Sequence, residues 1–274
     1  MNTEEDISKI DEMNLSEIKE LLDILAKKGQ FPDKLIYILG KDNRVGCQRL
    51  LKTYLKQKRS LDLKLEKLED MIEFDRNFQI QVAGIDEAGR GPLAGPVVAA
   101  AVVLDFENLD WALGINDSKQ LKREERQFFY DLILEKAKYV GVGMADVALI
   151  DEINIRNATH KAMEEAVSNI VGISAKDLYL LVDGLEVPIL GERHCPIVQG
   201  DAKSLSIAAA SIVAKEKRDS LMEELDRFYP GYGFSKHKGY GTKEHIRALA
   251  KLGPSPVHRR SFLTNFSFKQ GSLF

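Results

Sequence analysis

The stretch around which this chain is organised is Gly84-Ile-Asp-Glu-Ala-Gly-Arg-Gly-Pro-Leu-Ala-Gly-Pro96. An acidic pair, Asp86-Glu87, follows apolar residues and precedes a loop of three glycines, two prolines and one arginine. Adjacent carboxylates at the end of a buried strand repel each other, and a divalent cation is a natural counter-charge because it chooses oxygen ligands. Glycines leave backbone N–H groups open to phosphates or hydroxyls. The stretch therefore indicates chemistry on phosphate.

Other interpretations of the same stretch remain open. An Asp-Glu pair after a strand is commonly a solvated turn. The glycines also suggest a dinucleotide loop, but Gly89, Gly91 and Gly95 follow the spacing GxGxxxG instead of GxGxxG. A Walker-type loop would end in Gly-Lys-Ser/Thr, which this loop lacks. Both nucleotide-cofactor interpretations are therefore weak.

Length and composition describe an ordinary globular protein. The chain has 274 residues, of which 44% are hydrophobic and 30% charged. No run of eighteen apolar residues occurs, and the acidic N-terminus lacks an apolar signal core, so we expect no membrane span and a cytoplasmic location. Cys47 and Cys195 fit a reducing compartment. No feature demands more than a monomer.

The charge is distributed unevenly. The net charge is -3, yet residues 41–59 and 236–260 each hold seven basic residues and one acid. Such patches can hold a phosphate backbone in a slightly acidic protein, although solvated helix faces are the simpler interpretation of the first.

Two regions of different character follow from the hydrophobic periodicity. Residues 1–76 are predicted to form a helical N-terminal extension, either a substrate-binding arm or an interaction surface, because leucine and isoleucine recur at helical spacing. These residues are Leu15, Ile18, Leu21, Leu22, Leu25, Leu50, Leu51, Leu55, Leu61 and Leu65. Residues 77–274 are predicted to form the catalytic domain, with a basic helical segment near the C-terminus.

Strands and helices alternate in this second region. Strands are predicted over residues 78–83, 96–104, 139–147, 178–182 and 196–198. Helices are predicted over residues 121–138, 148–171 and 204–228, with Thr242 as a further helix cap. This alternation predicts an α/β domain around a mixed sheet.

Acidic residues recur after the apolar runs of this region. Asp183 follows one predicted strand, and Asp201 follows another just before a long helix. Each alone has an ordinary interpretation, a turn for Asp183 and a helix cap for Asp201. Strand ends converge in α/β sheets, however, so together with Asp86 and Glu87 they predict an oxygen-rich site for Mg²⁺ or Mn²⁺.

The 84–96 motif closely resembles the signature of bacterial ribonuclease HII. Further similar motifs cover about residues 78–263: Asn116-Asp-Ser-Lys119, Asn154-Ile-Arg-Asn-Ala-Thr159, Leu181-Val-Asp-Gly184, Gly200-Asp-Ala-Lys-Ser204, Ser211-Ile-Val-Ala-Lys-Glu-Lys-Arg-Asp219, Tyr229-Pro-Gly-Tyr-Gly233 and His237-Lys-Gly-Tyr-Gly-Thr242. The resemblance implies a ribonuclease H-like fold. It also implies cleavage of RNA in RNA·DNA hybrids and incision 5′ of single ribonucleotides embedded in duplex DNA, which leaves 5′-phosphate and 3′-hydroxyl ends.

The resemblance also implies roles for individual residues. Asp86, Glu87, Asp183 and Asp201 would bind two metal ions. Gly89, Arg90 and Gly91 would read the 2′-hydroxyl and flanking phosphates, and Tyr240 would pack on the sugar of the next deoxynucleotide. Lys119 is a candidate phosphate contact, while His237, His245 and His258 are expected to face phosphate or solvent.

Three rival functions follow from the same residues. Ribonuclease HIII shares the fold and carries N-terminal extensions, but the intact Gly89-Arg90-Gly91 favours HII. A silent nucleic-acid-binding module would have lost one or more of the four acids. A small-molecule phosphatase would not need the basic C-terminal segment. The apolar tail Gly271-Ser-Leu-Phe274 is a possible sliding-clamp peptide, although a frayed terminus is the simpler interpretation.

Overall fold

The computed structural model describes residues 7, 9–184 and 186–264. The chain divides into two compact units, Met1–Glu69 and Asp70–Phe274. The predicted clamp peptide at residues 271–274 lies outside the described residues. No helix in the described ranges is long and apolar enough to cross a lipid bilayer.

The N-terminal unit is helical, with a core of its own. It contains η1 (Ile10–Glu12), α2 (Leu15–Lys27), α3 (Asp33–Lys41) and the first part of α4 (Val45–Arg76). The side chain of Asn14 caps α2 by accepting the N–H groups of Ser16 and Glu17, and Glu17 accepts the Asn14 N–H in return. In α2, Ile18, Leu21, Leu22 and Leu25 of the predicted pattern are buried, whereas Leu15 at the start of the helix is exposed. In α4 the pattern is likewise buried only in part, because Leu55 and Leu65 are exposed.

The second unit is built on a five-stranded mixed sheet with the order β3-β2-β1-β4-β5. Its strands are β1 (Val82–Ala88), β2 (Val97–Val103), β3 (Tyr139–Ala145), β4 (Tyr179–Asp183) and β5 (His194–Ile197). β1 pairs antiparallel with β2, and β2 pairs antiparallel with β3. β4 runs parallel to β1, and β5 runs parallel to β4. The predicted α/β class is therefore confirmed.

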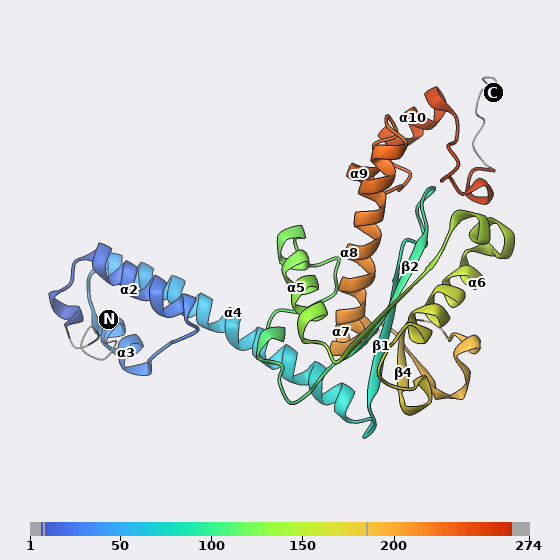
Figure 1. Cartoon of the computed structure of the whole chain (residues 1–274). Coiled ribbons are helices and arrows are strands. Elements are labelled where there is room, and N and C mark those ends of the chain that lie inside the picture. Colours follow the sequence, from blue (N-terminus) through green and yellow to red (C-terminus); the bar gives the residue numbers. More distant parts are fainter. Residues whose placement is uncertain (1–6, 8, 185, 265–274) are drawn as a thin grey trace. The chain divides into compact units, whose positions relative to one another are not determined.

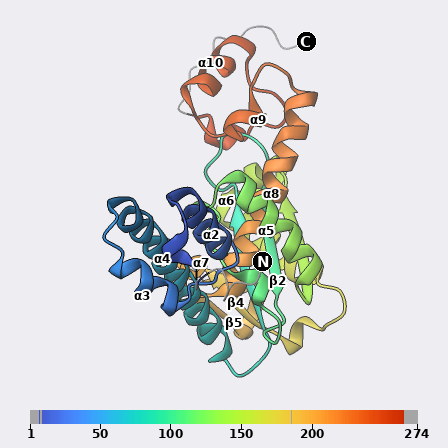
Figure 2. The same cartoon turned by 90° about the vertical axis from the view of Figure 1, so that its left-hand side faces the viewer.

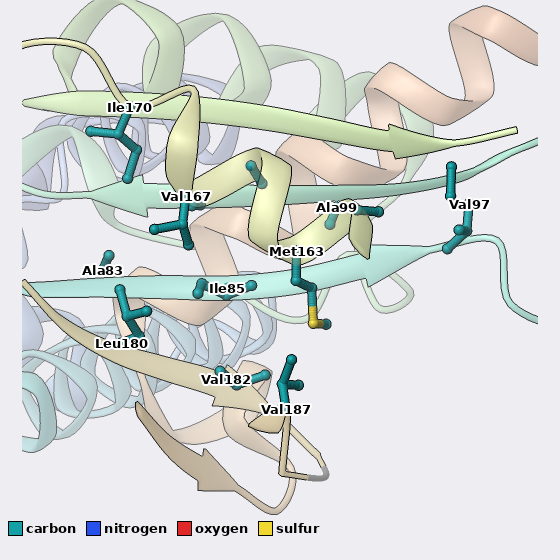
Figure 3. Close-up of a cluster of buried hydrophobic side chains, with 14 of the residues drawn as sticks. Ala83, Ile85, Val97, Ala99, Met163, Val167, Ile170, Leu180, Val182 and Val187 are labelled. Carbon is teal, nitrogen blue, oxygen red and sulfur yellow. The ribbon is translucent and has the colours of Figure 1, made fainter. Parts of the chain in front are cut away.

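Helices cover both faces of this sheet (Figure 1). α8 (Leu205–Phe228) packs against β1 and β2, and α6 (Val147–Ser168) packs against β2 and β3 on the other face. Figure 3 shows Met163 and Val167 of α6, and Ile170 just beyond this helix, beside the inward side chains of the strands. The remaining elements are α5 (Arg123–Lys136), α7 (Gly200–Lys203), α9 (Phe234–His237), α10 (Lys243–Leu252), η2 (Asp110–Ala112), η3 (Ala175–Asp177), η4 (Pro188–Arg193) and η5 (Arg260–Phe262).

The contact between β1 and α8 depends on one glycine. A Cβ atom on Gly84 would overlap with the backbone of Ser206 and Ile207 at the start of α8. The strand and the helix therefore approach more closely than any side chain at this position would allow. This close approach brings the N-terminal end of α8 and the preceding α7 next to the acidic end of β1.

The C-terminal elements form a smaller cluster at the far end of α8. Figures 1 and 2 both show α9 and α10 gathered beyond the sheet around this end of the helix. Their core is apolar and is made of Leu93, Ala94, Met222, Tyr232, Phe234, Leu249 and Leu263. Because Leu93 and Ala94 belong to the glycine-rich loop, this cluster is attached to the loop that follows β1.

The predicted boundaries of several elements need correction: the helices predicted over 121–138 and 148–171 are Arg123–Lys136 and Val147–Ser168, and the strand predicted over 139–147 ends at Ala145. The first strand begins at Val82 instead of residue 78 and includes Asp86 and Glu87 themselves, because α4 continues to Arg76 and a turn with Gln79 at φ 55° follows. Phe78 packs against Tyr179 in that turn. The last strand is His194–Ile197, and Val198 beyond it is exposed. The long helix begins at Leu205, with Ser204 as its N-cap.

Candidate active site

The parallel pairing of β1 and β4 places two carboxylates side by side. Ile85 pairs with Val182, and each is followed directly by an aspartate, Asp86 on β1 and Asp183 on β4. Side chains alternate between the two faces of a sheet, so both aspartates point away from the Ile85 and Val182 side chains in the α6 core. Asp86 is only 5% exposed.

A short helix supplies the third carboxylate. α7 follows β5, and its first turn contains Asp201, which is 8% exposed. The backbone N–H of Gly200 donates a hydrogen bond of 2.7 Å to Oδ1 of Asp183, which holds α7 against the end of β4. Carboxylate oxygens of Asp86, Asp183 and Asp201 lie within 4.8 Å of one another. The structure therefore brings together three of the four predicted acids.

The electrostatics of this acidic cluster favour a cation. Burial, together with the charges of Glu87 and Asp183, raises the pKa of Asp86 well above its ordinary value. Burial and the charge of Asp183 also raise the pKa of Asp201. Like charges held together at low dielectric destabilise the ionised form, and a divalent cation removes that penalty. The oxygen-only donor set is the type that divalent hard cations prefer.

Glu87 lies outside this group of three. It follows Asp86 in the strand and faces the α6 side, where it lines a small cavity with Arg90 and Asp183 and with Arg156 and His160 of α6. Its Oε1 is 3.3 Å from Nη1 of Arg90. Burial raises the pKa of Glu87, while Arg90 counteracts part of that rise.

The glycine-rich loop and the Tyr240 segment lie against each other. Leu93 N–H donates to the Gly239 carbonyl at 2.8 Å, which ties the two segments together. A Cβ on Gly91 would be 3.7 Å from ring carbon Cε1 of Tyr240, so the half-exposed tyrosine ring lies beside this glycine. Gly89 has φ 98°, and a side chain there would overlap with Arg218. Residues some 150 positions apart thus form one surface next to the acidic cluster.

Lys119 also reaches the acidic cluster. Its Nζ is 3.9 Å from Oδ2 of Asp201, and its side chain is 77% exposed. The loop is held by Asp117, whose Oδ1 accepts the Lys119 N–H at 2.9 Å, and by a 2.7 Å hydrogen bond between the hydroxyls of Ser118 and Ser211. Asp117 was not predicted as a site residue, although it belongs to the Asn116-Asp-Ser-Lys119 motif. Its charge contributes to the raised pKa of Asp201.

The prediction for the histidines is wrong for two of the three. His245 and His258 are buried, and their Nε2 atoms are 3.0 Å apart. They pack against Phe234 in the apolar cluster around α9 and α10 instead of facing phosphate or solvent. The cap predicted at Thr242 is confirmed, since its Oγ1 accepts the His245 N–H. Asp219 on α8 forms an ion pair with Lys215 at 2.7 Å.

Comparison with known proteins identifies the family. Residues 83–269 match the family model described as ribonuclease HII, and residues 14–79 match the model described as ribonuclease HII N-terminal domain. The chain belongs to the ribonuclease HII family. The ribonuclease HII of Bacillus licheniformis is 46% identical over 89% of this chain and 95% of that protein. The ribonuclease HII of Lachnoclostridium phytofermentans is 46% identical over 93% of this chain and 98% of that protein.

Solved structures agree with the fold. The ribonuclease H2 of Pyrococcus horikoshii superposes with a TM-score of 0.56 at 25% identity, covering 66% of this chain and 93% of that one. The ribonuclease HII of Archaeoglobus fulgidus, solved in complex with PCNA, also has a TM-score of 0.56, at 24% identity over 71% and 98% of the two chains. The sheet is thus ribonuclease H-like.

Family membership establishes the activity. Ribonucleases HII are endonucleases that cleave RNA in RNA·DNA hybrids and at embedded ribonucleotides, and this chain is such an enzyme. The family match decides against ribonuclease HIII, and the acidic cluster agrees with an active nuclease in place of a silent binding module. A phosphatase acting on small substrates is likewise ruled out.

Proposed function

We propose that Asp86, Asp183 and Asp201, with Glu87, hold Mg²⁺ or Mn²⁺ at the centre of a nuclease site. The observation that supports this proposal most strongly is the group of three buried or half-buried carboxylates with oxygens within 4.8 Å of one another. Four carboxylates are enough ligands for the two cations of a two-metal mechanism. On this substrate class the products are a 5′-phosphate and a 3′-hydroxyl, and incision takes place 5′ of the ribonucleotide.

The roles of the chain's own residues follow from their positions. When bound, divalent cations supply the positive charge that activates water for in-line attack and stabilises the departing 3′-oxygen. Asp86 and Asp183 form the rigid part of the ligand set because both are fixed by the β-sheet. Asp201 is set on α7, which the Gly200–Asp183 hydrogen bond holds in place. Lys119, next to Asp201 and exposed, is positioned to contact a phosphate of the substrate strand.

Substrate recognition is assigned to the glycine-rich loop and Tyr240. Backbone groups of Gly89, Arg90 and Gly91 would contact the 2′-hydroxyl, which both donates and accepts hydrogen bonds and so distinguishes RNA from DNA. Tyr240 would pack on the sugar of the following deoxynucleotide. Its ring lies beside Gly91, and this proximity supports a single surface that senses both sides of an RNA–DNA junction.

The test of this proposal is incision of a DNA duplex that contains one ribonucleotide. We expect cleavage on the 5′ side with Mg²⁺ or Mn²⁺, none with EDTA, and a loss of about 100-fold or more in Asp86→Asn and Asp201→Asn. Asp177→Asn is the matched control, because this exposed carboxylate precedes β4 and so lies at the opposite end of that strand from Asp183. Wild-type rates in either cluster variant would refute the assignment of the metal site.

The domain division is proposed on the same basis. Residues 1–76 would form an accessory helical domain, and residues 77–274 would carry catalysis. We expect a chain that begins at Asp70 to retain incision, since it keeps the carboxylate of Asp75 against α8. A sliding-clamp contact through residues 271–274 and a monomeric state stay predictions, to be checked by pull-down with a clamp and by light scattering.

A further inference from the structure

A buried arginine lies behind the glycine-rich loop. Arg259 has no measurable exposure, and its guanidinium donates to four backbone carbonyls of that loop. Nη2 donates to Gly89 O at 2.6 Å and Nε to Gly95 O at 2.9 Å. Nη1 donates to Arg90 O at 3.0 Å and to Pro92 O at 2.8 Å. One planar group therefore fixes four points along residues 89–95.

A second buried arginine connects this loop to the Tyr240 segment. Arg218 on α8 is 1% exposed. It donates to Pro96 O at 2.9 Å, to Ala94 O at 3.2 Å and to Lys238 O at 3.1 Å. The two proposed recognition elements, the glycine-rich loop and the segment that carries Tyr240, are thus fastened by the same side chain.

Neither guanidinium forms an ion pair with a carboxylate of residues 9–184 or 186–264; the charges of Asp219 on Arg218 and of Asp151 on Arg259 act from beyond ion-pair distance. Burial and the charge of Arg218 lower the pKa of Arg259 to about 9. A buried cation without a carboxylate in direct contact is costly, so its retention requires well-made hydrogen bonds. All of the donors assigned above go to backbone carbonyls, which makes the conformation of the loop the feature that the arginine stabilises.

Arg259 is itself held firmly. Its backbone N–H donates to Leu93 O at 2.9 Å, and its guanidinium lies 5.2 Å from the centre of the Phe262 ring. The next residues are anchored on α6, because Asp151 accepts the N–H groups of Arg260 at 2.8 Å and Ser261 at 3.0 Å. The segment 258–262 is therefore a fixed support for the loop.

We propose that Arg259 is a positioning residue that sets the selectivity for embedded ribonucleotides by fixing the backbone of residues 89–95, with Arg218 linking that loop to Tyr240. This inference rests on the proposed function of Gly89–Gly91 and Tyr240. The guanidinium is suited to the task because its donors are spread across a rigid plane. A lysine presents three donors from one atom and cannot span four carbonyls.

The test compares Arg259→Lys with Arg260→Lys, a matched change at the exposed neighbouring residue. The substrates are a DNA duplex with one ribonucleotide, a continuous RNA·DNA hybrid and an all-DNA duplex. For Arg259→Lys we expect kcat/KM on the single-ribonucleotide duplex to fall about tenfold or more, since small misplacement of contacts is costly. The hybrid should be affected less, because it offers a 2′-hydroxyl in every register. Mn²⁺ affinity, measured by calorimetry, should stay within about twofold of wild type, since the carboxylates are untouched.

A second variant covers the case in which Arg259→Lys does not fold. Asp151→Ala removes the acceptors that anchor residues 260 and 261, and we expect a smaller loss of the same selectivity. A folded Arg259→Lys with wild-type selectivity would overturn the proposal, as would equal losses on both ribonucleotide substrates together with weakened Mn²⁺ binding.

The variant Tyr240→Ala distinguishes failure of this inference from failure of the proposed function. If Tyr240→Ala alters selectivity while Arg259→Lys does not, only the positioning role of Arg259 fails. If neither Tyr240→Ala nor Gly91→Ala alters selectivity, the proposed recognition surface itself fails.

Discussion

Asp86 and Asp183 occupy adjacent places on β1 and β4, each directly after the paired residues Ile85 and Val182. The sheet therefore forces two carboxylates together, and the pKa of Asp86 is raised by burial and by its acidic neighbours. An arrangement of this kind is unfavourable in the free protein and becomes favourable when a cation is bound. Its consequences can be measured as stability as well as activity.

Removing one charge from the cluster should stabilise the metal-free protein. In EDTA, Asp86→Asn is expected to raise the free energy of unfolding by about 1–2 kcal/mol, because buried like charges are relieved. Added Mn²⁺ should raise the melting temperature of the wild type and leave the variant nearly unchanged. Thermal denaturation with and without Mn²⁺ measures both effects. A variant that is less stable than the wild type in EDTA would contradict this interpretation.

The close contact between β1 and α8 makes a specific demand at Gly84. Gly84→Ala is expected to destabilise the protein by about 3 kcal/mol or more, because the methyl group would overlap with the backbone of Ser206 and Ile207. Gly40→Ala in α3 is the matched control, since nothing lies within 4 Å of a Cβ there. Alanine has the higher helix propensity, so the control should be neutral or slightly stabilising. Urea denaturation of the two variants compares them, and equal stability would contradict the packing argument.

The buried carboxyl group of Asp75 should make the stability of the protein depend on pH at values above those at which an exposed aspartate titrates. Its side chain accepts the Ser206 N–H at 2.9 Å, and burial raises its pKa to about 6 from an ordinary value of 3.8. Because the folded-state pKa is the higher one, the protonated form favours folding, and that contribution is lost as pH rises through about 6. The free energy of unfolding of Asp75→Asn should therefore exceed that of the wild type by about 1–2 kcal/mol at pH 8 and by little at pH 4. A gain that does not change with pH would argue against this assignment.

The buried pair His245 and His258 should give stability the opposite pH dependence to that of Asp75, with stability falling as pH falls. His258 Nδ1 accepts the Ser255 N–H at 2.9 Å, so its Nε2–H donates to His245 Nε2, and His245 Nδ1–H donates to Tyr240 O at 2.9 Å. Burial and the neighbouring His245 lower the pKa of His258 to about 4 from 6.5. Both rings are neutral in the fold, so stability is complete above about 6.5 and declines as pH falls toward 4.

The corresponding variant is His258→Asn, whose side-chain oxygen can still accept the Ser255 N–H. Between pH 7 and pH 4, titration of His258 should lower the free energy of unfolding of the wild type by up to about 2–3 kcal/mol. The variant lacks this imidazole, so its stability should fall correspondingly less. Chemical denaturation at several pH values measures the difference. Parallel curves for the two proteins would show that His258 does not titrate in this window.

The parts of the site that sequence alone could predict are those encoded locally. The acids after apolar runs, the glycine-rich loop and the alternation of strands with helices are patterns within short windows. They predicted the fold class and a cluster of four carboxylates, of which the structure brings together Asp86, Asp183 and Asp201. Element boundaries were less accurate, because the start of β1 depends on how far α4 extends and on the packing of Phe78 against Tyr179. Asp117 could have been found, since it lies within a motif that was already identified.

By itself, the sequence determined the chemical character of this protein: an oxygen-rich acidic site, a loop with open backbone groups, and an α/β frame. Only the tertiary structure decided which partners meet. It turned Glu87 toward the α6 face while Asp86 joined Asp183 and Asp201, it buried His245 and His258, and it placed Arg259 against Gly89, 170 residues away in the chain. The physical reason is that every residue has a backbone carbonyl, so the residue type does not indicate which carbonyl will accept a hydrogen bond. A contact between an arginine and distant carbonyls therefore exists only once the strands, α8 and the C-terminal segment have packed together.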